Sequence, residues 1–168
     1  AIVWTALGIG DARRHLPQTG RGWAALGLLG LVLLQVALGG FVAGLDAGMG
    51  YNTWPLMDGK LIPEGLFAAS PAWRNIFENA MTVQFDHRMI AYAVFIAVAA
   101  YAYVVRSRSA VILLAATLLQ VALGIHTLLE QVPMHLGLMH QGGALIVLAA
   151  ALWNAHRVLR RSPVPDRQ

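Results

Sequence analysis

Histidine is the side chain in this sequence with the clearest capacity for metal or cofactor chemistry. The chain has six histidines and no cysteine. Four of the histidines fall beside long apolar segments, at what we expect to be one common end of them: His87, His126, His135 and His140. Ionisable side chains at membrane depth are costly and usually functional. These four residues are therefore the first candidates for a functional site.

An internal repeat singles out two of the four. The heptapeptide LLQVALG at Leu33–Gly39 recurs without change at Leu118–Gly124. Each copy is followed by a polar link and then by another apolar segment that opens with a histidine, His87 and then His140. Two imidazoles that face each other across a helix bundle can ligate a haem iron on both axial faces. The pattern therefore predicts a haem site, with hydrogen bonding between helices as the alternative role for both histidines.

Small residues accompany both histidines. Gly142, Gly143 and Ala144 follow His140, and Ala91 lies one turn after His87. Such residues leave room for a flat macrocycle, and they equally allow two helices to pack closely.

For the remaining polar residues near these segments we expect structural roles, or alternatives to cofactor binding. We expect His126 to hydrogen-bond to Glu130 or to the following loop, and His135 to lie in that loop. We expect His15 and His156, in basic flanks, to be solvated. For Gln35 and Gln120, near the bilayer midplane, we expect hydrogen bonds between helices. Arg88 could pair with haem propionates, with Asp86 or with Glu78. No carboxylate pair, Ser-His-Asp set, phosphate loop or zinc spacing is present, so the catalytic residues are unknown.

The elements that position these residues are predicted from composition. Of 168 residues, 58% are hydrophobic and 12% charged, with a mean hydropathy of +0.61. A soluble domain carries about 25% charged residues, so the low charge excludes a soluble globular enzyme and a disordered chain. The absence of cysteine excludes a module held together by disulfides. A spanning helix needs about 20 apolar residues. The segments that qualify are Trp23–Leu45, Gln84–Val105, Ala110–Leu129 and Leu136–Trp153. We predict an all-α membrane protein, a four-helix transmembrane bundle built from two repeated helix pairs.

Charge predicts the orientation of this bundle. Nine arginines and only two aspartates fall on the side that carries both ends of the chain, whereas the other side has three basic and six acidic residues. The positive-inside rule places both termini in the cytoplasm. The links Asp46–Val83 and Glu130–His135 then face outward, with the histidine pair near them. Because the basic residues flank apolar segments, no nucleic-acid partner is expected.

Five motifs in the chain resemble one known family. They are Gly40–Gly48 (GFVAGLDAG), Tyr51–Met57 (YNTWPLM), Asn75–Asn79 (NIFEN), Val83–Arg88 (VQFDHR) and His140-Gln141. Together they resemble the C-terminal half of the haem A synthases, in the form found in mitochondria and alphaproteobacteria. These oxidoreductases convert haem O to haem A, by oxidation of the C8 methyl group to a formyl group, for cytochrome c oxidase.

The resemblance implies an eight-span enzyme with two similar halves. Its C-terminal half holds haem b, and carried over to this chain the axial ligands of the iron are His87 and His140. The N-terminal half would receive the substrate haem O and carry out the oxidation. Implied partners are that half, a membrane electron acceptor and haem O synthase, in the bacterial inner (plasma) membrane with the haem toward the periplasm. The alternatives are a stand-alone b-type membrane cytochrome that only transfers electrons, and a non-haem bundle.

The expected division of the chain follows from these observations. Residues 1–21 are the end of a preceding span plus a cytoplasmic link, because the sequence begins with Ala1 and an apolar stretch to Ile9. Residues 22–161 form the four-helix haem-binding transmembrane half, and residues 162–168 are a cytoplasmic tail. The chain is thus expected to be a piece of a longer protein. The role of His126 and of the outer loop 46–83 stays open.

Overall fold

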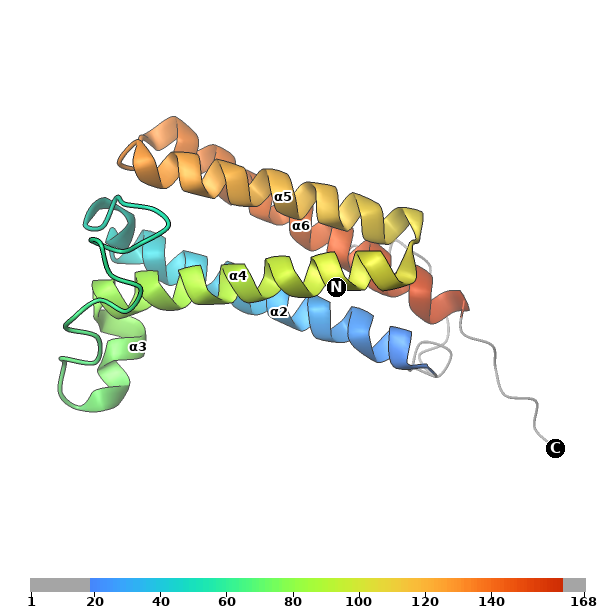
Figure 1. Cartoon of the computed structure of the whole chain (residues 1–168), viewed down its shortest axis with the longest axis horizontal. Helices are drawn as coiled ribbons and strands as arrows, with labels where there is room; N and C mark the ends of the chain where they lie inside the picture. Colours follow the sequence, from blue (N-terminus) through green and yellow to red (C-terminus); the bar gives the residue numbers. More distant parts are fainter. Residues whose placement is uncertain (1–18, 162–168) are drawn as a thin grey trace.

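Four long helices dominate the computed structural model, which describes residues 19–161 (Figure 1). They are α2 (Gly20–Gly44), α4 (Ala80–Val105), α5 (Arg108–Leu129) and α6 (Met134–Arg161). Each is long and apolar enough to cross a membrane. The predicted all-helical architecture is confirmed. The expectations for residues 1–18 and for the tail 162–168 lie outside the described residues.

Polar caps explain why the helices begin earlier than hydropathy alone suggests. Thr19 and Ser107 cap α2 and α5, with side chains that accept from the backbone N–H three residues ahead. The Asn79 side chain accepts from the N–H groups of Met81 and Thr82, so α4 starts at Ala80 rather than near Gln84. Such side chains satisfy N–H groups that have no partner inside the helix.

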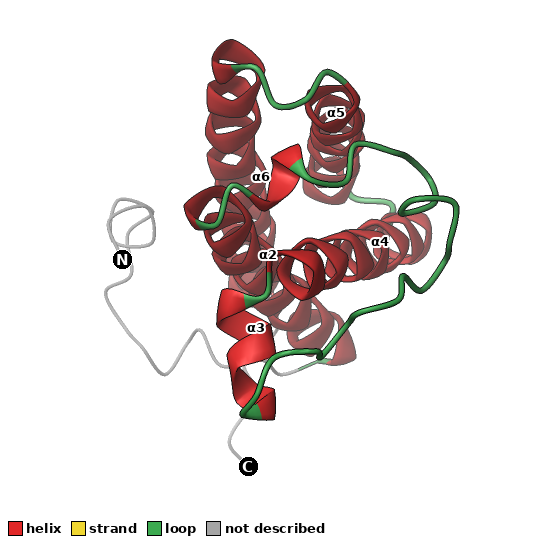
Figure 2. Ribbon diagram, turned by 90° about the vertical axis from the view of Figure 1, so that its left-hand side faces the viewer, coloured by secondary structure: helices red, strands yellow, loops and turns green. Residues whose placement is uncertain are grey.

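The helices form two antiparallel pairs, α2 with α4 and α5 with α6. Helix α2 also packs against α6, and α4 against α5, so that α4 and α6 lie diagonally opposite each other. The two pairs approach closely at the end that carries the short link between α4 and α5, and they diverge toward the end with the long loop (Figures 1 and 2). We call the latter the loop end of the bundle and the former the opposite end.

The contiguous hydrophobic core occupies only part of the bundle. Its buried members run from Ala25 to Val32 in α2, from Val94 to Ala102 in α4, from Ala110 to Leu113 in α5 and from Val147 to Ala155 in α6. Given the direction of each helix, all of these residues lie toward the opposite end. The core therefore stops before it reaches the level of the predicted histidine pair.

Helix α6 continues eight residues past its predicted end at Trp153. Its extension is buried rather than solvated, because Asn154 accepts a hydrogen bond from Ser109 at 2.8 Å and donates one to the Tyr101 hydroxyl at 3.2 Å. His156, in the same extension, is only 4% exposed. The expectation that His156 is solvated is therefore wrong, since the basic flank remains helical and keeps one face in the bundle.

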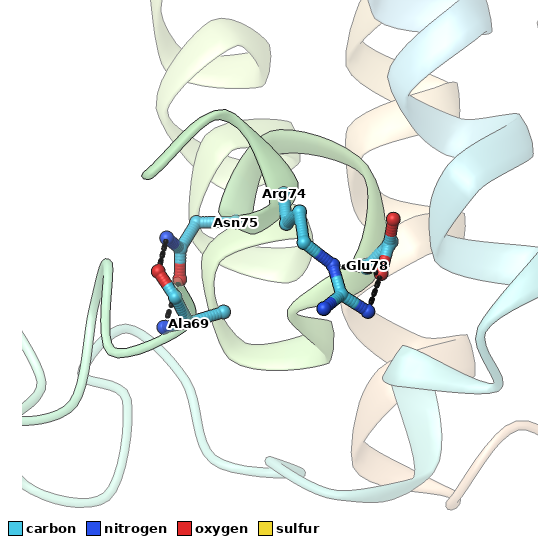
Figure 3. Close-up of polar contacts among 4 residues, drawn as sticks. All are labelled: Ala69, Arg74, Asn75 and Glu78. Atoms are coloured by element: carbon cyan, nitrogen blue, oxygen red, sulfur yellow. Dashed lines mark hydrogen bonds and ion pairs between the residues drawn. The ribbon is translucent and has the colours of Figure 1, made fainter. Parts of the chain in front are cut away.

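The loop between α2 and α4 is ordered by side-chain contacts with its own backbone. It contains two short 3-10 helices, η2 (Ala47–Met49) and η3 (Ala72–Arg74), and the single-turn helix α3 (Asn75–Glu78). Asn75 is fully buried; its Nδ2 donates to the carbonyl of Ala69 and its Oδ1 accepts from the Ala69 N–H, both at 2.8 Å (Figure 3). Arg74 forms an exposed ion pair with Glu78, and the hydrogen bond to Glu78 raises the pKa of Arg74.

Candidate functional site

The two histidines that the repeat predicts occupy equivalent positions in the structure. His87 is the eighth residue of α4 and His140 the seventh of α6, counted from the loop end. At about 1.5 Å of rise per residue, both lie about 10 Å inside the helix start. Their helices are diagonal neighbours in the bundle, and both side chains are partly buried.

The glutamine of the first heptapeptide holds His87. Gln35, on α2, places its Nε2 3.0 Å from Nδ1 of His87, 3.2 Å from Nε2 of the same ring and 3.1 Å from the backbone oxygen of His87. An amide NH₂ has two hydrogens, so it can donate to one ring nitrogen and to the backbone oxygen. The Gln35 Oε1 atom is buried and has no hydrogen-bond partner.

The glutamine of the second heptapeptide repeats this arrangement. Gln120, on α5, places its Nε2 3.1 Å from Nδ1 of His140 and 2.7 Å from the His140 backbone oxygen. The expectation that Gln35 and Gln120 bond between helices is thus confirmed. What the sequence reasoning missed is the partner, because it treated the glutamines and the histidines as separate features.

The last residue of each heptapeptide provides the surface against which the imidazole lies. A Cβ atom placed on Gly39 would lie 3.1 Å from His87 Cε1, and one placed on Gly124 would lie 2.7 Å from His140 Cε1. Glutamine and glycine are four residues apart in the repeat, so they share one helix face. The sequence contained a signal for this pairing: each heptapeptide has a glutamine and a glycine four residues apart, and the next apolar segment contains a histidine.

The small residues after His140 differ from one another in use. A Cβ atom on Gly143 would collide with Oε1 of Gln120, so this glycine makes room for the amide. Gly142 has no described atom within 4 Å of such a Cβ. The expected space beside His140 is thus partly taken up by the glutamine that holds it.

These residues fit a haem better than a bare metal ion. Among residues 19–161, no group of three or more His, Cys, Asp or Glu side chains could hold a metal ion. A haem iron needs only axial ligands from the protein, because the macrocycle fills the other positions, and two neutral imidazoles are a common axial pair. The hydrophobic core ends before this level, so the two histidines lie outside the tightly packed part of the bundle. The buried Gln35 Oε1, which has no hydrogen-bond partner, is a further polar atom beside His87.

Arg88, next to His87 on α4, binds the loop between α2 and α4. It is 8% exposed, and its Nη1 and Nη2 donate to the carbonyls of Thr53 and Tyr51 at 2.8 and 2.7 Å. Gln84, one turn earlier, donates to the Ala47 carbonyl at 2.8 Å. Neither Asp86 nor Glu78 is a partner of Arg88 among the described residues, so the ion pairs considered for it are not formed.

The same loop reaches across to the second helix pair. Asn52 donates to the Leu128 carbonyl at the end of α5, at 3.0 Å. Gly48 approaches the short loop so closely that a Cβ on it would lie 2.8 Å from Val132 Cγ2. The loop between α2 and α4 and the loop between α5 and α6 therefore contact each other at the loop end of the bundle.

The other two histidines at this end stay apart from the pair. His126, near the end of α5, and His135, in the first turn of α6, are both exposed. The His126 and Glu130 side chains, both in the described part of the chain, form no hydrogen bond with each other, so that expectation is wrong; only the His126 carbonyl accepts the Glu130 N–H, at 3.1 Å. His15 lies outside the described residues.

Comparison with known proteins gives a consistent result. The family model described as cytochrome oxidase assembly protein (COX15-CtaA) matches residues 1–152. The chain is 44% identical over 164 residues to the haem A synthase of Parvibaculum lavamentivorans, which covers 95% of this chain and 48% of the relative. It is 54% identical over 134 residues to that of Mesorhizobium japonicum, with 73% and 37% covered. No solved structure gives a significant match.

The chain spans less than half the length of these curated relatives. Its family match, in contrast, covers most of its own residues, and it includes both heptapeptides and both histidines of the pair. Four helices suited to crossing a membrane agree with that match. The chain belongs to the COX15-CtaA family of cytochrome oxidase assembly proteins, as an integral membrane protein similar to bacterial haem A synthases.

Proposed function

We propose that this chain is the haem b-binding, C-terminal half of a haem A synthase of the alphaproteobacterial type. The observation that carries the proposal is the repeated Gln–His–Gly arrangement. It places one imidazole on each helix pair, at equal depth and at the level where the packed core ends. His87 and His140 would be the two axial ligands of the iron.

A haem with two histidine ligands supplies electron transfer and leaves no open iron position for oxygen chemistry. The protein's own residues would bind and shield that group. Gln35 and Gln120 hold the imidazoles, the glycines Gly39 and Gly124 set how closely α2 and α5 approach them, and Arg88 keeps the outer loop over the loop end. This arrangement supports passage of electrons rather than attack on a substrate.

The remaining steps fall to parts outside this chain. In the proposed enzyme, haem O would bind to the other half, where its C8 methyl group is oxidised to a formyl group. A haem b held by His87 and His140 would supply the capacity for electron transfer toward a membrane acceptor. Exposed basic residues at the opposite end, among them Arg21, Arg106 and Arg108, support a cytoplasmic location for that end and a periplasmic one for the histidine level.

The haem spectrum of the protein purified from membranes in mild detergent tests the ligand pair. We expect a b-type haemochrome with the low-spin signature of two histidine ligands. His87→Ala and His140→Ala should each abolish that signature, whereas His126→Ala and His135→Ala, at exposed sites near the same end, should leave it unchanged. Absence of b-type haem, or an unchanged spectrum in both of the first two variants, would overturn the proposal.

Complementation tests the activity. The full open reading frame should restore haem A in a bacterial strain that lacks haem A synthase, and His87→Ala in that frame should not. Restoration of b-type haem binding without haem A would instead indicate an electron-transfer cytochrome.

A further inference from the structure

We propose that Gln35 and Gln120 are positioning residues, which fix the orientation of the two ligand imidazoles and tune their strength as ligands. The inference rests on the proposed haem site. It goes beyond that site because it gives the glutamine of each heptapeptide a role in the electronic properties of the iron. The two glutamines occupy the same place in the repeat, and each places its amide nitrogen near Nδ1 and the backbone oxygen of its histidine. Gln35 differs in that its Nε2 also lies 3.2 Å from Nε2 of His87.

Each amide ties an imidazole to its own backbone. The Nε2 of Gln35 reaches both Nδ1 and the carbonyl oxygen of His87, and the Nε2 of Gln120 reaches the same two atoms of His140. One donor group that holds the ring and the main chain together restricts rotation about both side-chain torsions of the histidine. The glycine four residues later, on the same helix face, limits how closely the ring can approach at Cε1.

The amide can also serve the ring when it ligates a metal. An imidazole that accepts a hydrogen bond at Nδ1 carries its proton on Nε2, whereas ligation through Nε2 requires the proton on Nδ1 and an acceptor for it. The Oε1 of Gln35 is buried, unpartnered and part of the same amide. Rotation of that amide by half a turn would replace the donor at Nδ1 with an acceptor, at the cost of the hydrogen bond to the His87 backbone oxygen. A hydrogen-bond acceptor on Nδ1–H makes the imidazole a stronger ligand.

The alternative is that the glutamines only hold the helices together. Polar side chains in membrane bundles commonly do so, and loss of such a bond would lower stability alone. A positioning role makes a different prediction, because the redox potential and the spectrum of the haem then depend on what Nδ1 meets.

The experiment uses the full-length protein with its haem. Gln35→Met and Gln120→Met keep the side-chain length and remove the hydrogen bond, and Gln35→Glu and Gln120→Glu keep an oxygen at the same reach. Asn154→Leu, which removes buried hydrogen bonds between helices at the opposite end, is the matched control. Three quantities are measured: haem transfer to an excess of a haem-binding apoprotein, the electron paramagnetic resonance of the ferric haem, and its midpoint potential.

We expect the Met variants to hold haem about 10- to 100-fold more weakly and to shift the midpoint potential to more positive values. The Glu variants should restore binding and shift the potential to more negative values. Asn154→Leu should change neither the haem affinity nor the midpoint potential. If wild type binds haem through His87 and His140, yet all four glutamine variants keep its affinity, resonance and potential, this inference is wrong while the proposed function stands. If wild type binds no b-type haem, both are wrong.

Discussion

Replacing Gly124 with alanine should displace His140, one of the two proposed haem ligands, by an amount that the structure specifies. The new Cβ would lie 2.7 Å from His140 Cε1, whereas ordinary van der Waals contact begins at 3.4 Å. The ring or the helix must therefore move by about 0.7 Å. The same substitution at Gly39 places Cβ 3.1 Å from His87 Cε1 and requires a movement of about 0.3 Å.

These two displacements fall on opposite sides of what a functional site tolerates, which is about 0.5 Å. We expect Gly124→Ala to weaken haem binding by about 10- to 100-fold, in the range seen when the support of a metal ligand is lost, and to lower the unfolding free energy by about 1–3 kcal/mol through overpacking. Gly39→Ala should weaken haem binding by less than about tenfold.

Gly30→Ala is the matched control, because this glycine lies in α2 at the level of the hydrophobic core, away from the histidines, and a Cβ there meets no described atom within 4 Å. Alanine is the better helix former by about 1 kcal/mol, so this variant should be at least as stable as wild type and retain all its haem. The assay is the haem-to-protein ratio from the haemochrome spectrum, followed during transfer to a haem-accepting apoprotein. Equal haem retention by Gly124→Ala and Gly30→Ala would refute the reasoning.

Three further predictions concern the loop that closes the loop end. Arg88→Leu removes two charged hydrogen bonds to the carbonyls of Tyr51 and Thr53 and should lower the unfolding free energy by about 3 kcal/mol, as measured by thermal unfolding in detergent; an unchanged melting temperature would contradict this. Asn75→Ala should cost about 2 kcal/mol and speed proteolysis within the loop without loss of helical circular dichroism; cleavage at the wild-type rate would count against it. Arg74→Gln should leave the melting temperature unchanged, because exposed ion pairs contribute little, and a clear drop would show that the Arg74 pair is structural.

The sequence predicted how many long helices the described residues form and where the central part of each helix lies. It could do so because membrane spans require long apolar runs, which few other structures contain. It predicted their ends less well. Hydropathy does not register a capping Asn79, and it assigned the polar residues after Trp153 to solvent although α6 buries His156 there. A polar side chain in an apolar helix can be buried if a partner satisfies it, and that partner is a matter of tertiary structure.

The candidate site was likewise predicted in part: the sequence identified the two histidines and missed their partners. The repeat predicted His87 and His140 as a pair because identical heptapeptides imply identical surroundings. The partner of each histidine depended on which helices are neighbours, which the sequence alone left open. Arg88 illustrates the limit most clearly, since the partners considered for it were haem propionates, Asp86 and Glu78. In the structure it donates to Gln84 Oε1 and to carbonyl oxygens of the folded loop, 35 and 37 residues away.

The division of the bundle into two equivalent helix pairs has a consequence for assembly. Each pair contains one histidine with its own glutamine and glycine, so each is a complete half-site, and the pair of imidazoles exists only when two half-sites meet. The link between α4 and α5 consists of residues 106–107 alone. For short tethers the effective concentration of one module around the other is on the order of millimolar. The encounter of the half-sites is therefore intramolecular, and it does not depend on how many copies of the protein the membrane contains.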